Sequence, residues 1–217
     1  MRLHKPFIAI DLGGTIEDTW SEKRAWFAPR GVDLGSRPLS RIDIVGKSGV
    51  TDALYSEMVA SVYSDNHILK HTLVAGCYEA LMNISLRFRI ILLSSRPESQ
   101  RNVTIQWLRQ NTLLHLVDDI ALIGSDANKL SWCRSRSVLI FIDDDIRHLE
   151  PDNYETSVGR IHYTGRICQQ RSPLHDQIKE ASDWKNISHL IARLGAQPLA
   201  LNWPKKEIGG GVKWSVY

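Results

Sequence analysis

Short apolar runs recur along the chain, and each stops at a polar or glycine-rich stretch. The runs are FIAID at 7–11, FRIILLS at 88–94, DDIALIG at 118–124, SVLIFID at 137–143 and VGRIHYT at 158–164. Apolar runs of this length, bounded by turn residues, are typical of strands buried on both faces of a parallel sheet. The pattern therefore predicts five such strands.

Helical spacing fills the segments between these runs. It is present in GCYEALMNIS at 76–85, PESQRNVTIQWLRQN at 97–111, DANKLSWCRSR at 126–136 and SDWKNISHLIARLG at 182–195. Pro97 suits the first turn of its helix, and Ser182 or Asp183 suits the N-cap of the last helix. The alternation of strands and helices predicts an α/β fold, in which helices cover both faces of a parallel sheet in three layers.

Residues 19–70 interrupt this alternation directly after the first strand. They contain scattered Trp, Pro and Gly residues, together with a stretch of helical period, VTDALYSEMVASVY, at 50–63. We predict that they form a small, mostly helical cap inserted into a core made of residues 1–18 and 71–195. Residues 196–217 have no clear period and are predicted to be a C-terminal tail.

Composition narrows the class of protein. The 217 residues include 43% hydrophobic and 24% charged residues, and this balance is ordinary for a globular domain with a buried core. The net charge of +3 is too small to indicate a nucleic acid polymer as partner. No apolar stretch approaches the roughly 20 residues needed to cross a bilayer, so no membrane partner is expected.

Cysteine usage indicates a reducing compartment. Cys77, Cys133 and Cys168 are scattered and odd in number, without the spacing of a disulfide framework or a zinc site. The apolar run at the N-terminus is too short for a signal peptide. We expect a cytoplasmic protein, and the sequence leaves open whether two copies form a homodimer.

Polar side chains stand at the ends of three predicted strands. Asp11, Ser94 and Asp143 each close an apolar run, and ligands gather at the carboxyl ends of parallel strands. Asp143 also begins a run of three aspartates in FIDDDIRHL at 141–149. Adjacent carboxylates repel one another and need a cation, and their hard oxygen ligands favour Mg²⁺.

Two of these strand ends carry groups suited to phosphate. Gly13, Gly14 and Thr15 follow Asp11, and their backbone N–H groups are able to cradle an anion. The Ser94 hydroxyl precedes the N–H groups of a helix start, which also bind phosphate oxygens. Arg96 lies close enough to reach a substrate phosphate, although it could equally pair with a structural carboxylate.

Taken in order, these residues resemble the four motifs of the haloacid dehalogenase (HAD) superfamily. The first motif of that family reads D-x-D-G-T after an apolar strand, and this chain has Asp-Leu-Gly-Gly-Thr at 11–15. The second motif matches Ser94, the third matches Lys129, and the fourth matches Asp143 and Asp144. Within the superfamily, LLSSRPESQRNVTIQWLRQN at 92–111 looks most like the 5'-nucleotidase/deoxyribonucleotidase-like branch.

The resemblance implies a Rossmann-like HAD fold and a magnesium-dependent phosphohydrolase. Asp11 would be the nucleophile that forms an aspartyl-phosphate, while Ser94 and Lys129 neutralise the phosphoryl oxygens. The Mg²⁺ ligands would be Asp11, the carbonyl of Gly13, Asp143 and Asp144. The substrate would be a small phosphorylated metabolite, with nucleotides among the candidates, contacted by Gly13, Gly14, Thr15, Ser95 and Arg96.

One position departs from the family pattern. Gly13 stands where the family has a second aspartate, which protonates the leaving group and then activates water. General acid–base help of this kind is worth about 10²–10⁴ in rate, and glycine cannot supply it. Either the substrate has a good leaving group, or another acid acts, or the chain binds phosphate compounds without efficient turnover. The alternative acids in the sequence are Glu17, Asp18, His67 and His71.

A second family also resembles the first motif. IAIDLGGT at 8–15 looks like the phosphate loop of sugar kinases of the actin-like ATPase fold, where glycine at position 13 is expected. That fold requires a second strand directly after the turn, forming a hairpin. The following IEDTWSEKRAWF at 16–27 lacks strand alternation, so we favour the HAD interpretation.

The cap combines cations with aromatic residues. They are Lys23, Arg24, Arg30, Arg37, Arg41 and Lys47, with Trp20, Trp26 and Phe27. This composition would suit a phosphorylated compound that bears a ring. It is equally compatible with solvated charge around a small apolar core.

Overall fold

A computed structural model of the chain describes residues 5–36, 39, 41–47, 49–150, 157–165 and 178–196. All but the first residue of the predicted C-terminal tail lies outside these ranges, as do Arg37 and Cys168. Among the described residues, no helix combines the length and the apolar character needed to cross a membrane.

The core of the structure is one parallel sheet with the strand order β3-β2-β1-β4-β5-β6. The strands are β1 Phe7–Asp11, β2 Arg89–Ser94, β3 Asp119–Leu122, β4 Ile140–Asp143, β5 Gly159–Tyr163 and β6 Ile178–Ala181. The five predicted strands are confirmed, whereas β6 was not predicted. Central β1 pairs with β2 on one side and with β4 on the other, so the ends of these three strands lie next to one another.

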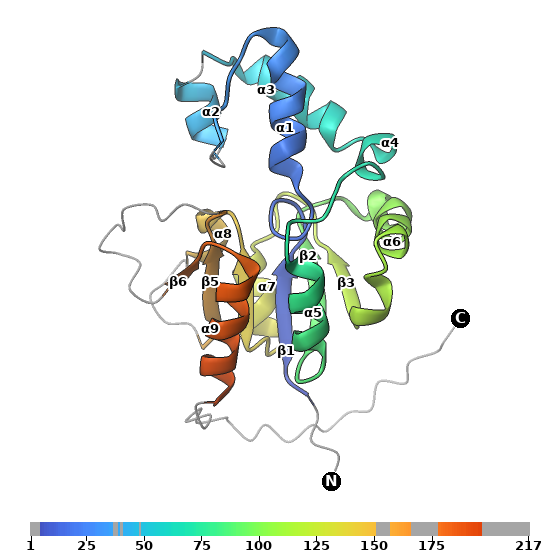
Figure 1. Cartoon of the computed structure of the whole chain (residues 1–217), viewed down its shortest axis with the longest axis vertical. Coiled ribbons are helices and arrows are strands. Elements are labelled where there is room, and N and C mark those ends of the chain that lie inside the picture. The colour runs from blue at the N-terminus through green and yellow to red at the C-terminus, as the bar shows by residue number, and fades with distance from the viewer. Residues whose placement is uncertain are drawn as a thin grey trace.

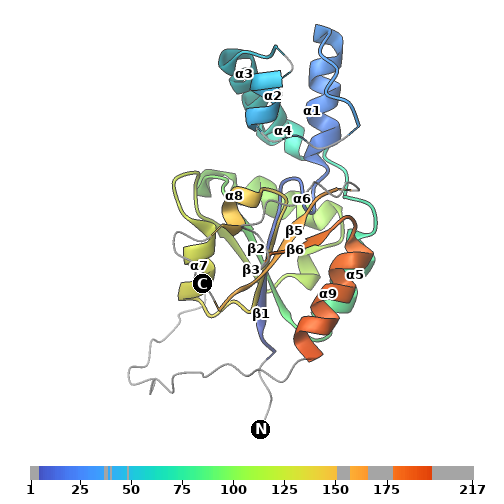
Figure 2. The same ribbon diagram turned by 90° about the vertical axis from the view of Figure 1, so that its left-hand side faces the viewer.

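Helices cover both faces of the sheet (Figures 1 and 2). One face packs against α5 Cys77–Ser85, α6 Arg101–Gln110 and α9 Trp184–Ala196, and the other packs against α7 Lys129–Ser135 and α8 Ile146–Leu149. Short 3₁₀ turns, η2 Glu98–Gln100 and η3 Leu114–Leu116, flank α6. This confirms the predicted three-layer α/β architecture.

The alternation of side chains along β1 explains its continuous apolar run. Ile8 and Ile10 belong to the core under α5, α6 and α9, whereas Ala9 belongs to the core under α7. Successive residues of a strand point to opposite faces, so a strand covered on both sides must be apolar at each position.

Residues that follow β1 form a helical cap above the carboxyl edge of the sheet (Figure 1). Its elements are α1 Thr19–Phe27, η1 Ala28–Arg30, α2 Arg41–Lys47, α3 Asp52–Val62 and α4 Asp65–Ile68. The cap has its own apolar core, in which Phe27, Ile44 and Met58 are fully buried. The predicted small, mostly helical cap after strand one is therefore confirmed.

The chain leaves β1 through a turn into α1 and forms no hairpin. Both neighbours of β1 are parallel to it and come from distant parts of the sequence. The second strand that a sugar kinase requires after the glycine turn is thus replaced by the helix Thr19–Phe27. This arrangement rules out the actin-like alternative.

Two chain segments connect the cap to the core, and they run side by side. The N–H of Asp18 donates to the carbonyl of Thr72 at 2.9 Å, and the N–H of Val74 donates to the carbonyl of Ile16 at 2.8 Å. Backbone hydrogen bonds across this junction fix where the cap enters and leaves the core.

Candidate active site

Three carboxylates meet where β1 and β4 end. Asp11 closes β1, Asp143 closes β4, and Asp144 follows it. Each offers one oxygen, and these three oxygens lie within 4.8 Å of one another. Asp11 and Asp143 are only 4% and 0% exposed, so their mutual repulsion is poorly screened by water. The predicted convergence of positions 11 and 143–144 is therefore present.

Lys129 joins two of these carboxylates. It is the first residue of α7, and its ammonium donates hydrogen bonds to Asp11 and, at 2.9 Å, to Oδ2 of Asp143. Burial alone would lower the pKa of Lys129, but the two carboxylates raise that pKa above its ordinary value. The ammonium is thus a permanent positive charge inside the acidic cluster.

The three acids differ in their ionisation. Burial raises the pKa of Asp11 to about 6, with Lys129 opposing the shift. Burial, assisted by the charges of Asp11 and Asp143, raises the pKa of Asp144 well above its ordinary range. At Asp143 burial acts in the same direction, but Lys129 and His148 outweigh it and lower the pKa. One ammonium does not balance three carboxylates, so this all-oxygen donor set fits a divalent cation such as Mg²⁺.

The glycine turn holds Asp144 in place. Gly14 has a φ of +93°, and a Cβ at this position would lie 2.1 Å from Oδ2 of Asp144. Its N–H donates to the carbonyl of Glu17 at 2.9 Å. Thr15 is fully buried, and its hydroxyl donates to Oδ1 of Asp144 at 3.4 Å. We predicted substrate contacts for Gly14 and Thr15. Gly14 lines a cavity together with Asp144, and the Thr15 hydroxyl is directed to the same carboxylate, so the turn packs directly against Asp144.

A cavity of about 360 Å³ opens between these carboxylates and the cap. The predicted site residues Asp11, Gly13, Ser94, Ser95, Arg96, Asp143 and Asp144 all line it. From the cap it is lined by Lys23, Tyr55, Val59 and Tyr63, and from the core also by Pro97, Gln100, Asp145 and His148. The structure therefore brings most of the predicted residues to one cavity, with Lys129 buried against Asp11 and Asp143.

Arg96 has a buried partner. Its guanidinium donates to both carboxylate oxygens of Glu17, with Nη1 3.0 Å from Oε1, and Glu17 is fully buried. Nδ1 of His71 contacts the same carboxylate at 3.2 Å, and Nε2 of His71 contacts the carbonyl of Val62 at 3.0 Å. The structural pairing that we considered for Arg96 is therefore present, although the guanidinium still borders the cavity.

The four alternative acids all have structural partners. Glu17 and His71 belong to the buried network with Arg96. Asp18 caps α1 and accepts a hydrogen bond from the N–H of Ser21 at 3.0 Å. His67 contacts Glu22 at 2.8 Å. None of the four lines the cavity that contains Asp11.

Replacement of Glu17 by glutamine is expected to lower the free energy of unfolding by about 2 kcal/mol, because the Arg96 guanidinium would keep one neutral acceptor in place of a charged, bidentate one. Urea denaturation followed by circular dichroism measures this change. Glu79→Gln on the exposed face of α5 is the matched control and should leave the midpoint unchanged. Equal stability of the Glu17 variant and the wild type would contradict a net contribution from the buried pair.

Sequence reasoning missed several residues that line the cavity. Tyr55 and Tyr63 come from the cap, and His148, which contacts Oδ2 of Asp143 at 3.1 Å, comes from α8. Lys23, also from the cap, was expected only as one of several cations that would suit a phosphorylated compound. The position of His148, five residues after Asp143 in a run that starts a helix, is the only local signal among them. Lys23 and Tyr63 depend on how the cap sits over the sheet, which no local pattern reveals.

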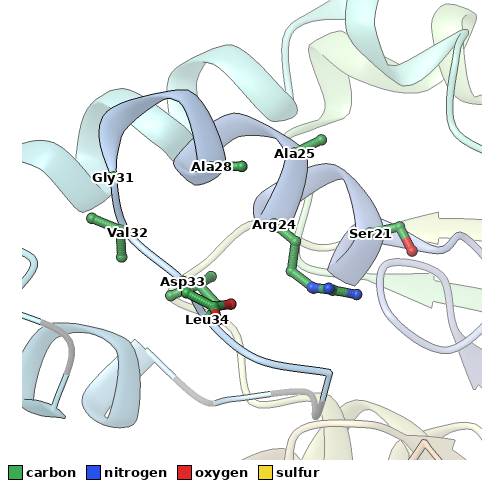
Figure 3. Close-up of a pocket in the computed structure, with 8 residues that line it drawn as sticks. All are labelled: Ser21, Arg24, Ala25, Ala28, Gly31, Val32, Asp33 and Leu34. Atoms are coloured by element: carbon green, nitrogen blue, oxygen red, sulfur yellow. The ribbon is translucent and has the colours of Figure 1, made fainter.

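A second and larger cavity, of about 530 Å³, lies in the cap between α1 and the loop after it (Figure 3). Its charged groups are Arg24 and Asp33, and it includes none of the clustered carboxylates. Size alone would favour this hollow, but the convergence of titratable groups assigns the chemistry to the smaller cavity.

No protein-family model matches the sequence, and no curated protein matches it. Solved structures do resemble the fold. HAD-hydrolase YfnB from Bacillus subtilis, described as bound to magnesium, aligns over 87% of this chain and 99% of its own, with a TM-score of 0.54 and 13% identity.

Two further structures give the same result. A haloacid dehalogenase-like family hydrolase from Streptococcus pneumoniae aligns over 86% of this chain and 98% of its own, with a TM-score of 0.55 and 16% identity. A protein named as a phosphatase from Clostridium difficile aligns over 88% and 100%, with a TM-score of 0.56 and 14% identity. At these identities the likeness establishes the HAD-type fold, which this chain shares.

Proposed function

We propose that the protein is a magnesium-dependent phosphohydrolase of the HAD type that acts on a small phosphorylated metabolite. The observation that carries this proposal is the cluster of Asp11, Asp143 and Asp144, with Lys129 between Asp11 and Asp143, at the carboxyl edge of a HAD-type sheet. A nucleophile, a fixed ammonium and a cation-binding set at one point are what phosphoryl transfer requires.

Asp11 is the nucleophile. One of its carboxylate oxygens attacks the phosphorus, the bond from phosphorus to the leaving oxygen breaks, and an aspartyl-phosphate forms. Water then attacks that phosphorus, phosphate departs, and the Asp11 carboxylate is restored. Lys129 and the hydroxyl of Ser94 stabilise the charge on the phosphoryl oxygens, and the amide of Ser95 and the guanidinium of Arg96 are the next contacts.

Asp11, Asp143, Asp144 and the carbonyl of Gly13 would hold the Mg²⁺, which supplies positive charge against the phosphoryl oxygens. The donor set supports this assignment because it consists of oxygens only and already carries more negative charge than Lys129 neutralises. The role of the Gly13 carbonyl rests on its resemblance to the first HAD motif.

The substrate class is suggested by an adjoining cavity of about 280 Å³. It shares Lys23, Tyr55 and Asp144 with the first cavity, and it adds Trp20 and Arg41 from the cap. A phosphate bound beside Asp11 would leave the rest of the molecule facing these aromatic and cationic groups. A nucleotide is therefore the first class of metabolite to test, in keeping with the resemblance to the 5'-nucleotidase branch.

Gly13 favours a second candidate, a HAD-fold protein that binds phosphate compounds and turns them over poorly. The glycine removes the side chain that would serve as acid, while the carboxylate cluster stays complete. Such a protein would bind Mg²⁺ and a phosphate analogue but would release no phosphate.

A combined assay separates the two candidates. We expect phosphate release from nucleoside monophosphates, phosphosugars or acyl phosphates that requires Mg²⁺ and stops with EDTA. Beryllium fluoride with Mg²⁺ should raise the melting temperature, because it mimics a phosphoryl group on an aspartate. A rise in melting temperature without turnover would favour the binding protein, and the absence of both would contradict the proposed site.

A further inference from the structure

Two side chains of the cap, Lys23 and Tyr63, line the cavity that contains the carboxylates. Lys23 lies on α1, and Tyr63 directly follows α3. Both line the cavity together with Asp11 and Ser94, and both are partly buried. Their role rests on the proposed phosphohydrolase function and concerns the departure of the leaving group.

Gly13 leaves open a space that Tyr63 borders. A Cβ built on Gly13 would meet Cε1 of Tyr63 at 3.7 Å, its hydroxyl at 3.9 Å and the methyl group of Thr19 at 3.7 Å. These are ordinary van der Waals contacts, and Gly13 is not among the glycines with a positive φ. A side chain at position 13 would therefore lie beside the Tyr63 hydroxyl, so this hydroxyl borders the place where such a side chain would act.

A cation lies beside the Tyr63 phenol. The Lys23 ammonium is 5.9 Å from the centre of the Tyr63 ring, and both side chains line the cavity. A positive charge at this place would stabilise a phenolate that forms during the reaction. Burial alone would lower the pKa of Lys23, but Tyr63, Tyr55 and Asp144 raise it, so the ammonium stays charged beside the phenol.

The core holds Tyr63 in this position. The side-chain amide of Gln100 in η2 donates to the backbone carbonyl of Tyr63 at 2.7 Å. The carbonyl of the preceding residue, Val62, contacts Nε2 of His71 at 3.0 Å. The end of α3 is thus attached to the core at two successive carbonyls, which fix the backbone of Tyr63 relative to the core.

The cationic groups beside Asp11 in the core have close carboxylate partners. Among the described residues that line the cavity, Arg96 is paired with Glu17 and His148 contacts Asp143. Lys129 donates to two carboxylates. The Tyr63 hydroxyl, in contrast, is one of the three atoms nearest to a Cβ built on Gly13, so it lies where the missing acid would act.

We propose that Tyr63 is the general acid that replaces the missing carboxylate at position 13, with Lys23 as its positioning residue. As Asp11 attacks, the bond from phosphorus to the leaving oxygen breaks, its electron pair stays on that oxygen, and the Tyr63 proton transfers to it. The Lys23 ammonium stabilises the phenolate. The phenolate then takes a proton from water, the resulting hydroxide attacks the aspartyl-phosphate, and the bond from phosphorus to Asp11 breaks.

The test compares two substrates that differ in their leaving group. The acetate of acetyl phosphate leaves without protonation. The alcohol of an alkyl phosphate such as glycerol phosphate needs a proton to leave. We expect Tyr63→Phe to lower kcat/KM for the alkyl phosphate by about 10²-fold and to change kcat/KM for acetyl phosphate by less than about threefold, because this ratio reports the first phosphoryl transfer and not the later attack of water. Lys23→Met should likewise lower kcat/KM for the alkyl phosphate by a larger factor than kcat/KM for acetyl phosphate. Tyr78→Phe on α5 removes a hydroxyl away from the cavity and is the matched control.

A double variant provides the rescue. Gly13→Asp in the Tyr63→Phe background should raise kcat/KM for the alkyl phosphate at least about tenfold above that of Tyr63→Phe alone. The carboxyl group would stand beside the vacated hydroxyl position. Equal losses for both substrates, or no loss for either, would overturn the role of Tyr63 while Asp11-dependent hydrolysis of acetyl phosphate still supports the phosphohydrolase. If the wild type hydrolyses neither substrate and binds no beryllium fluoride, the proposed function fails, and the role of Tyr63 fails with it.

Discussion

Asp11→Asn is expected to abolish magnesium-dependent phosphate release, with kcat falling by about 10⁴-fold or more. The amide has nearly the shape of the carboxylate but cannot attack phosphorus, so no aspartyl-phosphate forms. The substitution also replaces one of the three carboxylates that would hold Mg²⁺ with a neutral amide. A malachite green assay with the best substrate measures the loss, and the variant should no longer show a melting-temperature rise with beryllium fluoride.

The control for this variant is Asp119→Asn, which makes the same chemical change at an exposed residue. Asp119 begins β3, the edge strand that is separated from β1 by β2, and it does not line the cavity. Its turnover should equal that of the wild type. If Asp11→Asn kept more than about a tenth of the activity, the nucleophile would have to be another group and the proposed mechanism would be wrong.

The sequence predicts those residues of the site that stand at the ends of strands. Asp11, Ser94 and Asp143 each close an apolar run, and parallel strands necessarily deliver such residues to one edge. That rule fixes the place of the carboxylate cluster before any contact is known. Lys129 needed the family resemblance in addition, because a lysine at a helix start is ordinarily a surface residue.

The part that sequence does not predict consists of contacts between distant segments. Glu17 meets His71 and Arg96 across 54 and 79 positions, and no local period encodes such pairs. Tyr63 reaches the cavity only because the cap folds back over the sheet. Strand β6 was missed because Ile178 and Ala181 are its only buried residues, so its four residues carry little apolar signal.

The structure gives a second reason for glycine in the turn after β1. The sequence Gly-Gly-Thr at 13–15 predicted a phosphate cradle, and a positive φ at Gly14 agrees with the need for glycine. The close approach of Asp144 provides the stronger reason, because a Cβ at Gly14 would overlap its carboxylate. The turn thus packs against Asp144, a member of the carboxylate cluster.

Lys129→Met should produce the largest loss of stability. Removal of the ammonium leaves Asp11 and Asp143 buried without the cation that bridges them, next to Asp144. Removal of one partner from a buried ion pair costs about 3–5 kcal/mol, so we expect a decrease of that size in the free energy of unfolding without Mg²⁺. Turnover should also be lost, because a phosphoryl oxygen loses its stabilising charge.

The dependence of this stability on Mg²⁺ tests the acidic cluster directly. A divalent cation that binds only the folded state raises the free energy of unfolding by RT ln(1 + [Mg²⁺]/Kd). The carboxylates of the variant lack the Lys129 charge, so they should bind Mg²⁺ more tightly than those of the wild type. Mg²⁺ should therefore raise the melting temperature of Lys129→Met by more than it raises that of the wild type. Lys179→Met, at an exposed lysine of β6, should respond as the wild type does. If Lys129→Met were as stable as the wild type and indifferent to Mg²⁺, the three carboxylates would not share a cation, and the basis for the proposed chemistry would be lost.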